Sequence, residues 1–173
     1  MINNMIIALT GTPGTGKHTL AEKLSKKMNF NVIDLGKALR GRTTEKEVTV
    51  RDINSAFKRL KKDNSIIVSH LSHFIRSKDI KLIIVLRTDP ELLAGRLKKR
   101  GYSPLKIYDN VMFEAIDGTY LEAVSTGKSV FQIDNSGGIG RCVEKAAAII
   151  KGTGKGDSVD FSDKIIKIEK MLK

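Results

Sequence analysis

An apolar run that leads directly into a glycine-rich loop, and then into an amphipathic segment, is the strongest constraint in this sequence. Residues Met5–Leu9 are apolar throughout, which predicts a buried strand. The loop Gly11–Lys17 reads Gly-Thr-Pro-Gly-Thr-Gly-Lys and fits the pattern G-x-x-x-x-G-K. Apolar residues then recur at helical spacing over about residues 16–28. A strand, this loop and a helix in that order predict a phosphate-binding loop (P-loop).

The residue types of the loop suit phosphate. Glycines allow successive backbone N–H groups to point inward at phosphate oxygens, and the helix that begins there adds the positive end of its dipole. Lys17 brings a positive charge to the β- and γ-phosphates. His18 occupies the position where the pattern has a Ser or Thr that ligates Mg²⁺, and we expect its neutral ring to lie over the loop. The residues expected to hold ATP are Gly11, Gly14, Thr15, Gly16, Lys17, His18 and Thr19.

The rest of the chain alternates short apolar runs with helical patterns. Further strands are predicted at residues 32–34, 65–69, 81–86 and 129–133. Helices are predicted at 35–63 in two pieces around a polar loop near 42–47, at about 90–100, at 109–126 after a loop at 102–108, and at 139–151. Strands that are apolar throughout and alternate with helices indicate a parallel sheet covered on both faces. We therefore predict one α/β domain over residues 1–173, a three-layer α/β/α sandwich with a five-stranded parallel sheet. Residues 152–156 are predicted to form a flexible linker before an amphipathic helix within 161–173.

Charge and composition indicate which partners and which cellular compartment to expect. The net charge of +12 favours anionic partners such as nucleotides or RNA, although a well-solvated lysine-rich surface typical of hot environments is the alternative. No apolar run approaches the ~20 residues that span a bilayer, and the start of the chain lacks the features of a signal peptide, so no membrane contact is expected. The single cysteine, Cys142, suits a reducing cytoplasm and is expected to be a core residue.

Three motifs together resemble a known family. The P-loop sequence, the later Leu86-Arg87-Thr88-Asp89-Pro90 and the stretch Lys99-Arg100-Gly101-Tyr102 resemble the adenylate kinase isoenzyme 6 family, over roughly residues 5–150. The resemblance implies a P-loop nucleoside-monophosphate kinase of broad-specificity type that converts ATP and AMP into two ADP with Mg²⁺. It also implies ATPase activity and a role in small ribosomal subunit maturation, with a small-subunit ribosomal protein or rRNA as partner. The order Lys-His-Thr is similar to adenylate kinases in general, which makes Thr19 the candidate metal ligand.

The resemblance also implies roles for segments outside the P-loop. Residues 34–51 would bind the nucleoside monophosphate, with Arg40 on its phosphate, and residues 99–109 would form a short lid over ATP. Arg96 and Arg100 would be the arginines of the lid side, and their spacing of four places both on one face of a helix. Two guanidinium groups there can grip a polyphosphate.

Two positions near the strand ends are also candidates. His70 is expected in the active site because it follows a strand of the sheet. The family has an acidic residue two positions before this histidine, where this chain has Val68, which affects how metal and water are handled. By analogy with the family, Asn135 and Ser136 would lie near the adenine, and His73 is expected to be structural or at the surface.

Four functions are compatible with these residues. The first is phosphoryl transfer from ATP to AMP, and the second is a ribosome-assembly ATPase or binding factor with weak kinase activity. The third is a P-loop kinase for another small acceptor, since the P-loop does not specify the acceptor. The fourth is an impaired nucleotide-binding module, which the departures at His18 and Val68 suggest.

Overall fold

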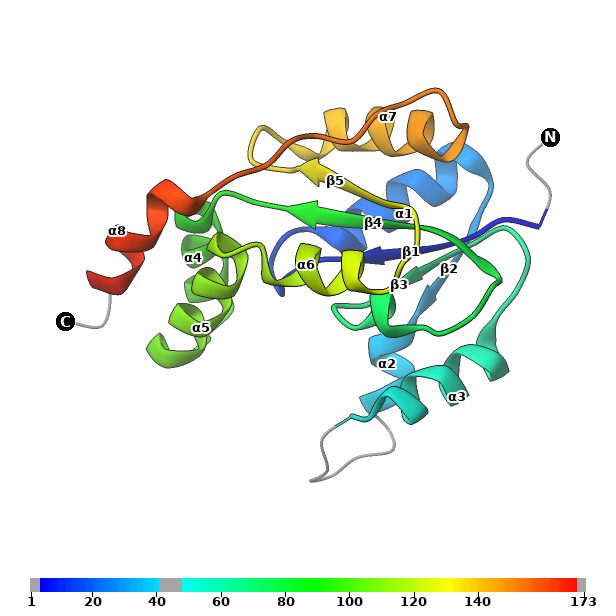
Figure 1. The fold of residues 1–173 in the computed structure, drawn as a ribbon, viewed down its shortest axis with the longest axis horizontal. Helices are drawn as coiled ribbons and strands as arrows, with labels where there is room; N and C mark the ends of the chain where they lie inside the picture. Colours follow the sequence, from blue (N-terminus) through cyan, green and yellow to red (C-terminus); the bar gives the residue numbers. More distant parts are fainter. Residues whose placement is uncertain (1–3, 41–47, 171–173) are drawn as a thin grey trace.

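The computed structural model describes residues 4–40 and 48–170, apart from the side chain of Arg40. Its sheet is built from strands that all run parallel, in the order β2-β3-β1-β4-β5. This confirms the predicted five-stranded parallel sheet (Figure 1). The strands are β1 (Ile6–Thr10), β2 (Asn31–Asp34), β3 (Ser65–Val68), β4 (Ile80–Arg87) and β5 (Val130–Asp134).

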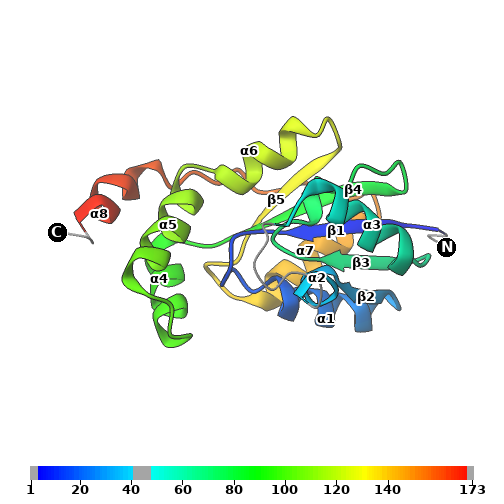
Figure 2. The ribbon, with the colours of Figure 1, turned by 90° about the horizontal axis from the view of Figure 1, so that it is seen from below.

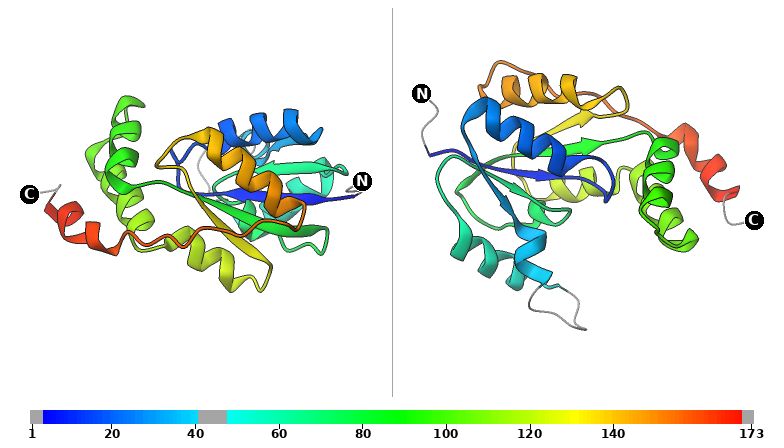
Figure 3. Two further views of the ribbon diagram at one scale, coloured as in Figure 1. Left: turned by 90° about the horizontal axis from the view of Figure 1, so that it is seen from above. Right: turned by 180° about the vertical axis from the view of Figure 1, so that it is seen from behind.

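Helices cover both faces of the sheet, as predicted. On one face α1 (Lys17–Met28) and α7 (Ile139–Ile150) lie side by side (Figure 3). On the other face lie α2 (Leu35–Arg40), α3 (Val50–Leu60) and α6 (Gly118–Ser125). Each layer buries an aliphatic cluster against the sheet, and the central strand β1 is buried along its whole length.

A separate group of helices packs together beyond the carboxyl ends of the strands, outside the α/β/α layers. There α4 (Pro90–Lys99) and α5 (Pro104–Ala115) form an antiparallel hairpin that projects from the sheet (Figure 2). The short helix α8 (Ile165–Glu169) packs on this hairpin through Ile165 and Ile168. No helix in the described part of the chain has the length and apolar character required to cross a membrane.

Two predicted element boundaries are wrong. Residues 102–108 do not form a loop, because α5 begins at Pro104 with Ser103 as its N-cap, and Ser-Pro is a strong helix start. The predicted helix over 109–126 is two helices, since Asp117 adopts a left-handed backbone conformation (φ 60°) between α5 and α6. The polar loop near 42–47 lies outside the described residues.

The segment after α7 runs along the sheet. Its backbone packs against β5: Asp157 donates its N–H to the carbonyl of Gln132 at 2.8 Å, and its carboxylate accepts from the N–H of Asp134 at 2.9 Å. A Cβ on Gly156 would lie 3.0 Å from the same Gln132 carbonyl oxygen. These contacts hold Gly156 and Asp157 against β5, whereas the glycines of residues 152–156 predict a flexible linker.

Candidate functional site

A pocket of about 340 Å³ lies at the carboxyl ends of β1, β2 and β3, where open parallel sheets bind ligands. The P-loop forms one wall, and Asp34 and the Ser69–His70 turn form another. The turn between α4 and α5 closes the third side with Arg100 and Tyr102. The structure therefore gathers one pocket from segments that are far apart in the sequence.

The P-loop needs glycine for two separate reasons. Gly14 and Gly16 have φ of 95° and 96°, a region that L side chains rarely adopt. Space is also lacking, because a Cβ on Gly16 would lie 2.7 Å from the Asn135 amide nitrogen, and one on Gly14 would lie 2.8 Å from Leu93. The loop is thus held tightly against its surroundings on the side away from the pocket.

Lys17 lies at the floor of this pocket, almost fully buried. Its ammonium group donates to the carbonyl of Thr12 at 3.2 Å. Burial, with the nearby charge of Arg100, lowers the pKa of Lys17 from 10.5 to about 8, although Glu114 and Asp34 oppose the shift. A buried ammonium group that donates to a neutral carbonyl is suited to receive an anion, and phosphate binding by Lys17 stays a prediction.

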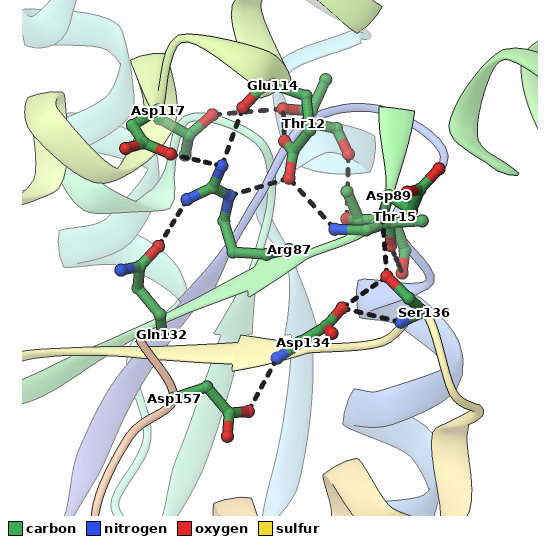
Figure 4. Close-up of polar contacts among 12 residues, drawn as sticks. Thr12, Thr15, Arg87, Asp89, Glu114, Asp117, Gln132, Asp134, Ser136 and Asp157 are labelled. Carbon is green, nitrogen blue, oxygen red and sulfur yellow. Dashed lines mark hydrogen bonds and ion pairs between the residues drawn. The ribbon is translucent and has the colours of Figure 1, made fainter. Parts of the chain in front are cut away.

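Three side chains from outside the P-loop form hydrogen bonds with it, namely Thr88, Glu114 and Asn135. Thr12 donates its hydroxyl to Glu114 at 2.5 Å (Figure 4). Thr88 donates to the carbonyl of Thr15 at 3.3 Å. Asn135 donates its side-chain amide to the same Thr15 carbonyl at 2.8 Å. Asn135 is buried with its amide committed to the P-loop. It therefore positions the loop, and its place beside adenine stays a prediction.

The two lid-side arginines are separated in the structure. Arg100 lines the pocket, and its contact with ATP stays a prediction. Arg96 instead points to the loop itself, where its guanidinium group lies 3.4 Å from the carbonyl of Gly14 and 3.5 Å from that of Asn135. Arg40 ends α2, and its side chain lies outside the described part of the chain.

Two neighbouring features of the pocket involve Asp34 at the end of β2. The His18 ring nitrogen Nε2 lies 3.3 Å from a carboxylate oxygen of Asp34. Burial lowers the pKa of His18 in spite of this carboxylate, which agrees with the neutral ring that the sequence predicts. In the sheet register, Asp34 pairs with Val68, so a carboxylate does lie beside the strand end where the family resemblance expects one.

The two histidines after β3 have different surroundings. His70 is exposed and lines the pocket, consistent with its predicted place in the site. His73 is buried, with its ring nitrogens 2.8 Å from the Thr10 hydroxyl and 3.1 Å from Glu122. Burial, reinforced by the charge of His70, lowers the pKa of His73 to about 4. The ring is therefore neutral near pH 7 and structural, as predicted.

The donor set fits Mg²⁺ that is held mainly by phosphates and water. Within residues 4–40 and 48–170, no cluster of three His, Cys, Asp or Glu side chains could hold a metal ion. The exposed Thr19 and the Asp34 carboxylate nevertheless line the same pocket. Mg²⁺ takes oxygen ligands, keeps several waters and binds proteins through few groups alongside phosphates, and two oxygen-bearing side chains beside the P-loop are compatible with that mode of binding.

Sequence reasoning missed the residues that support the P-loop. Glu114 and Arg87 are each 1% exposed, and neither is among the site residues that the sequence predicts. The available signal was a charged residue inside an apolar pattern: Arg87 ends an apolar strand, and Glu114 interrupts the apolar stretch of α5. Such residues need a partner, and only the fold identifies which one.

Residues 7–117 match the family described as AAA domain. "Putative adenylate kinase" of Thermococcus kodakarensis is 39% identical over 77% of both chains. The protein of the same name from Thermococcus onnurineus is 31% identical over 97% of both chains. The structure of shikimate kinase from Acinetobacter baumannii has the same fold, with a TM-score of 0.63 at 17% identity over 86% of this chain and 93% of that one. The chain thus belongs to the P-loop family that includes these archaeal proteins named "Putative adenylate kinase".

Proposed function

We propose that this protein is a nucleoside-monophosphate kinase that transfers the γ-phosphoryl group of ATP to AMP and forms two ADP. The observation that carries the proposal is the convergence of the P-loop, the buried Lys17 and Arg100 on one pocket of about 340 Å³. The names of the archaeal relatives support adenylate kinase activity in particular. Arg40, at the end of α2, is proposed to bind the phosphate of AMP.

The chemistry requires positioning and charge neutralisation more than covalent participation of the protein. The P-loop N–H groups and Lys17 hold the β- and γ-phosphates, and Lys17 donates to a phosphate oxygen while it keeps its bond to the Thr12 carbonyl. Arg100, on the turn between α4 and α5, approaches the same phosphates from the opposite side of the pocket and stabilises the charge that develops during transfer. Bound Mg²⁺, with Thr19 and Asp34 nearby, supplies further neutralisation of the phosphates.

The acceptor site is the open part of the pocket. The AMP phosphate is already anionic, so no general base is required for its attack on the γ-phosphorus. Closure of the α4–α5 turn over ATP would exclude water and suppress hydrolysis. Residues 99–109 are therefore proposed as the lid, although only the Arg100–Ser103 turn lies between helices.

The test is ADP formation from ATP with and without a panel of nucleoside monophosphates. We expect ADP to form rapidly with AMP and slowly with ATP alone. Lys17→Ala should abolish turnover, and Arg100→Ala should lower kcat at least about tenfold. Lys98→Ala is the matched control for Arg100→Ala, since it removes an exposed cation from the last turn of α4, two residues before Arg100, and should leave the rate unchanged.

The other outcomes identify the remaining candidates. ADP formed equally well without any monophosphate would indicate an ATPase, and turnover with a different acceptor alone would contradict the choice of AMP. The ribosome-assembly role stays a separate prediction, supported by the net charge of +12. It is tested by pull-down of small-subunit ribosomal components, whose loss at modest salt would indicate purely electrostatic binding.

A further inference from the structure

A buried carboxylate of the α4–α5 hairpin is hydrogen-bonded to the P-loop. Glu114 lies in the last turn of α5, and Thr12 is the second residue of the P-loop. The Thr12 hydroxyl donates to Glu114 Oε2 at 2.5 Å, and both residues are buried (Figure 4). Glu114 does not line the nucleotide pocket. Its contact with the P-loop is therefore distinct from the groups that face the ligand.

The Glu114 carboxylate has other hydrogen-bond and ion-pair partners besides Thr12. Its other oxygen, Oε1, accepts from Arg87 Nε at 2.8 Å and from the N–H of Thr88 at 3.0 Å. Arg87 is anchored in turn by Asp117, at 2.6 Å, and by Gln132. Since a buried carboxylate is stable when it is paired with a guanidinium and a second donor, the bond from Thr12 is not needed to neutralise it. The hydrogen bond between Thr12 and Glu114 is therefore expected to act on the P-loop rather than on the charge of Glu114.

Thr12 also contacts Lys17, through its backbone carbonyl. The carbonyl of Thr12 accepts from Lys17 Nζ at 3.2 Å and from the Thr15 hydroxyl at 2.9 Å. The position of Thr12 therefore sets where the lysine and the centre of the loop lie. At the other end of the hairpin, the turn between α4 and α5 carries Arg100 into the pocket. Glu114 is at the base of the helix that leads from this turn back to the P-loop.

We propose that Glu114 is a positioning residue. Its hydrogen bond with Thr12 aligns the P-loop with the α4–α5 hairpin, so that Lys17 and Arg100 reach the same phosphates and ATP binding orders the hairpin turn. The catalytic part of this inference rests on the proposed kinase function. The coupling between the P-loop and the hairpin rests only on ATP binding.

The perturbation is Thr12→Val, which keeps the shape of the side chain and removes the donor. Thr12→Ser restores the hydroxyl and is the rescue variant. Thr119→Val is the matched control, because the Thr119 hydroxyl lies 3.5 Å from that of Thr12 and is also buried, but it has no contact with the P-loop backbone or Glu114 among the described hydrogen bonds. Thermal unfolding of all variants shows whether the fold is kept.

The first measurement is hydrogen exchange of residues 100–115 with and without ATP. We expect ATP to slow exchange in the unmodified protein, in Thr12→Ser and in Thr119→Val, and to have little effect in Thr12→Val. Absence of ATP-dependent protection in the unmodified protein, or equal protection in Thr12→Val, would overturn the proposal. This measurement does not depend on the acceptor.

The second measurement is steady-state kinetics with ATP and AMP. Thr12→Val should lower kcat at least about tenfold while the affinity for ATP changes by less than about threefold, and Thr12→Ser should restore most of the rate. A Thr12→Val protein that is less stable but has an unchanged kcat would show a purely structural contact and contradict the proposal. If the unmodified protein forms no ADP with any monophosphate, the proposed function fails, and the exchange experiment still decides the coupling.

Discussion

Raising the pH from about 7 to about 9 should weaken ATP binding about tenfold, because Lys17 loses its proton in this interval. Burial holds the pKa of Lys17 at about 8 in the free protein. Phosphates in the loop would return it to its ordinary value of 10.5 or above, since they favour the charged form. The dissociation constant then increases by a factor of roughly 1.1 at pH 7 and roughly 11 at pH 9, which corresponds to about 1.4 kcal/mol.

Isothermal titration with ATP across this range measures the effect. Phosphate groups complete their ionisation near pH 6, and burial lowers the pKa of His18 further below this window, so neither the ligand nor His18 adds a change of this size. Lys17→Arg is the control, because a guanidinium stays protonated and its affinity should be flat over the same range. A flat profile in the unmodified protein would refute the reasoning, since it would mean that Lys17 is fully charged before ATP arrives or does not contact the phosphates.

Three further predictions concern the surroundings of the site. Because the pKa of His73 is lowered to about 4 in the folded protein, the unfolded chain binds more protons between about pH 4 and 6.5. Urea unfolding should therefore show a loss of about 2 kcal/mol between pH 7 and 5 that is absent in His73→Gln. Gly16→Ala should lower ATP affinity at least about tenfold, whereas Gly95→Ala, in open space on α4, should keep the affinity and raise the unfolding free energy by about 0.5–1 kcal/mol. The Cys142 thiol, buried and with its pKa raised by that burial, should react with a thiol reagent only after unfolding; fast labelling of the native protein would contradict its place in the core.

The sheet and the P-loop could be predicted because their signals are local. Strands buried on both faces are continuous apolar runs, such as Ile66–Val68 and Leu82–Leu86. The glycine pattern of the loop requires only its own backbone geometry. The start of α5 was predictable in principle from Ser103 and Pro104, while the left-handed Asp117 that ends it has no equally clear local signal.

The roles of individual polar side chains depend on contacts across the whole fold. The spacing of Arg96 and Arg100 predicts one helix face, but α4 ends at Lys99, so Arg96 contacts the P-loop backbone and Arg100, on the turn, lines the pocket. Asn135 bonds to a residue 120 positions earlier, and Glu114 to one 102 positions earlier. Helical spacing and motif matching cannot supply such partners, because they arise from how the strands and helices pack.

The middle position of β1 in the sheet has a consequence for the order in which the protein matures. This strand is made before the other strands of the sheet, and its two neighbours, β3 and β4, follow only at residues 65–68 and 80–87. Until then the nascent chain exposes an apolar strand with unpaired edges, which favours aggregation. Asn135, which donates to the P-loop carbonyl of Thr15, comes later still, so this support of the P-loop forms only after residue 135 has been made. The proposed ATP site is therefore expected to form only after the central strands of the sheet have paired.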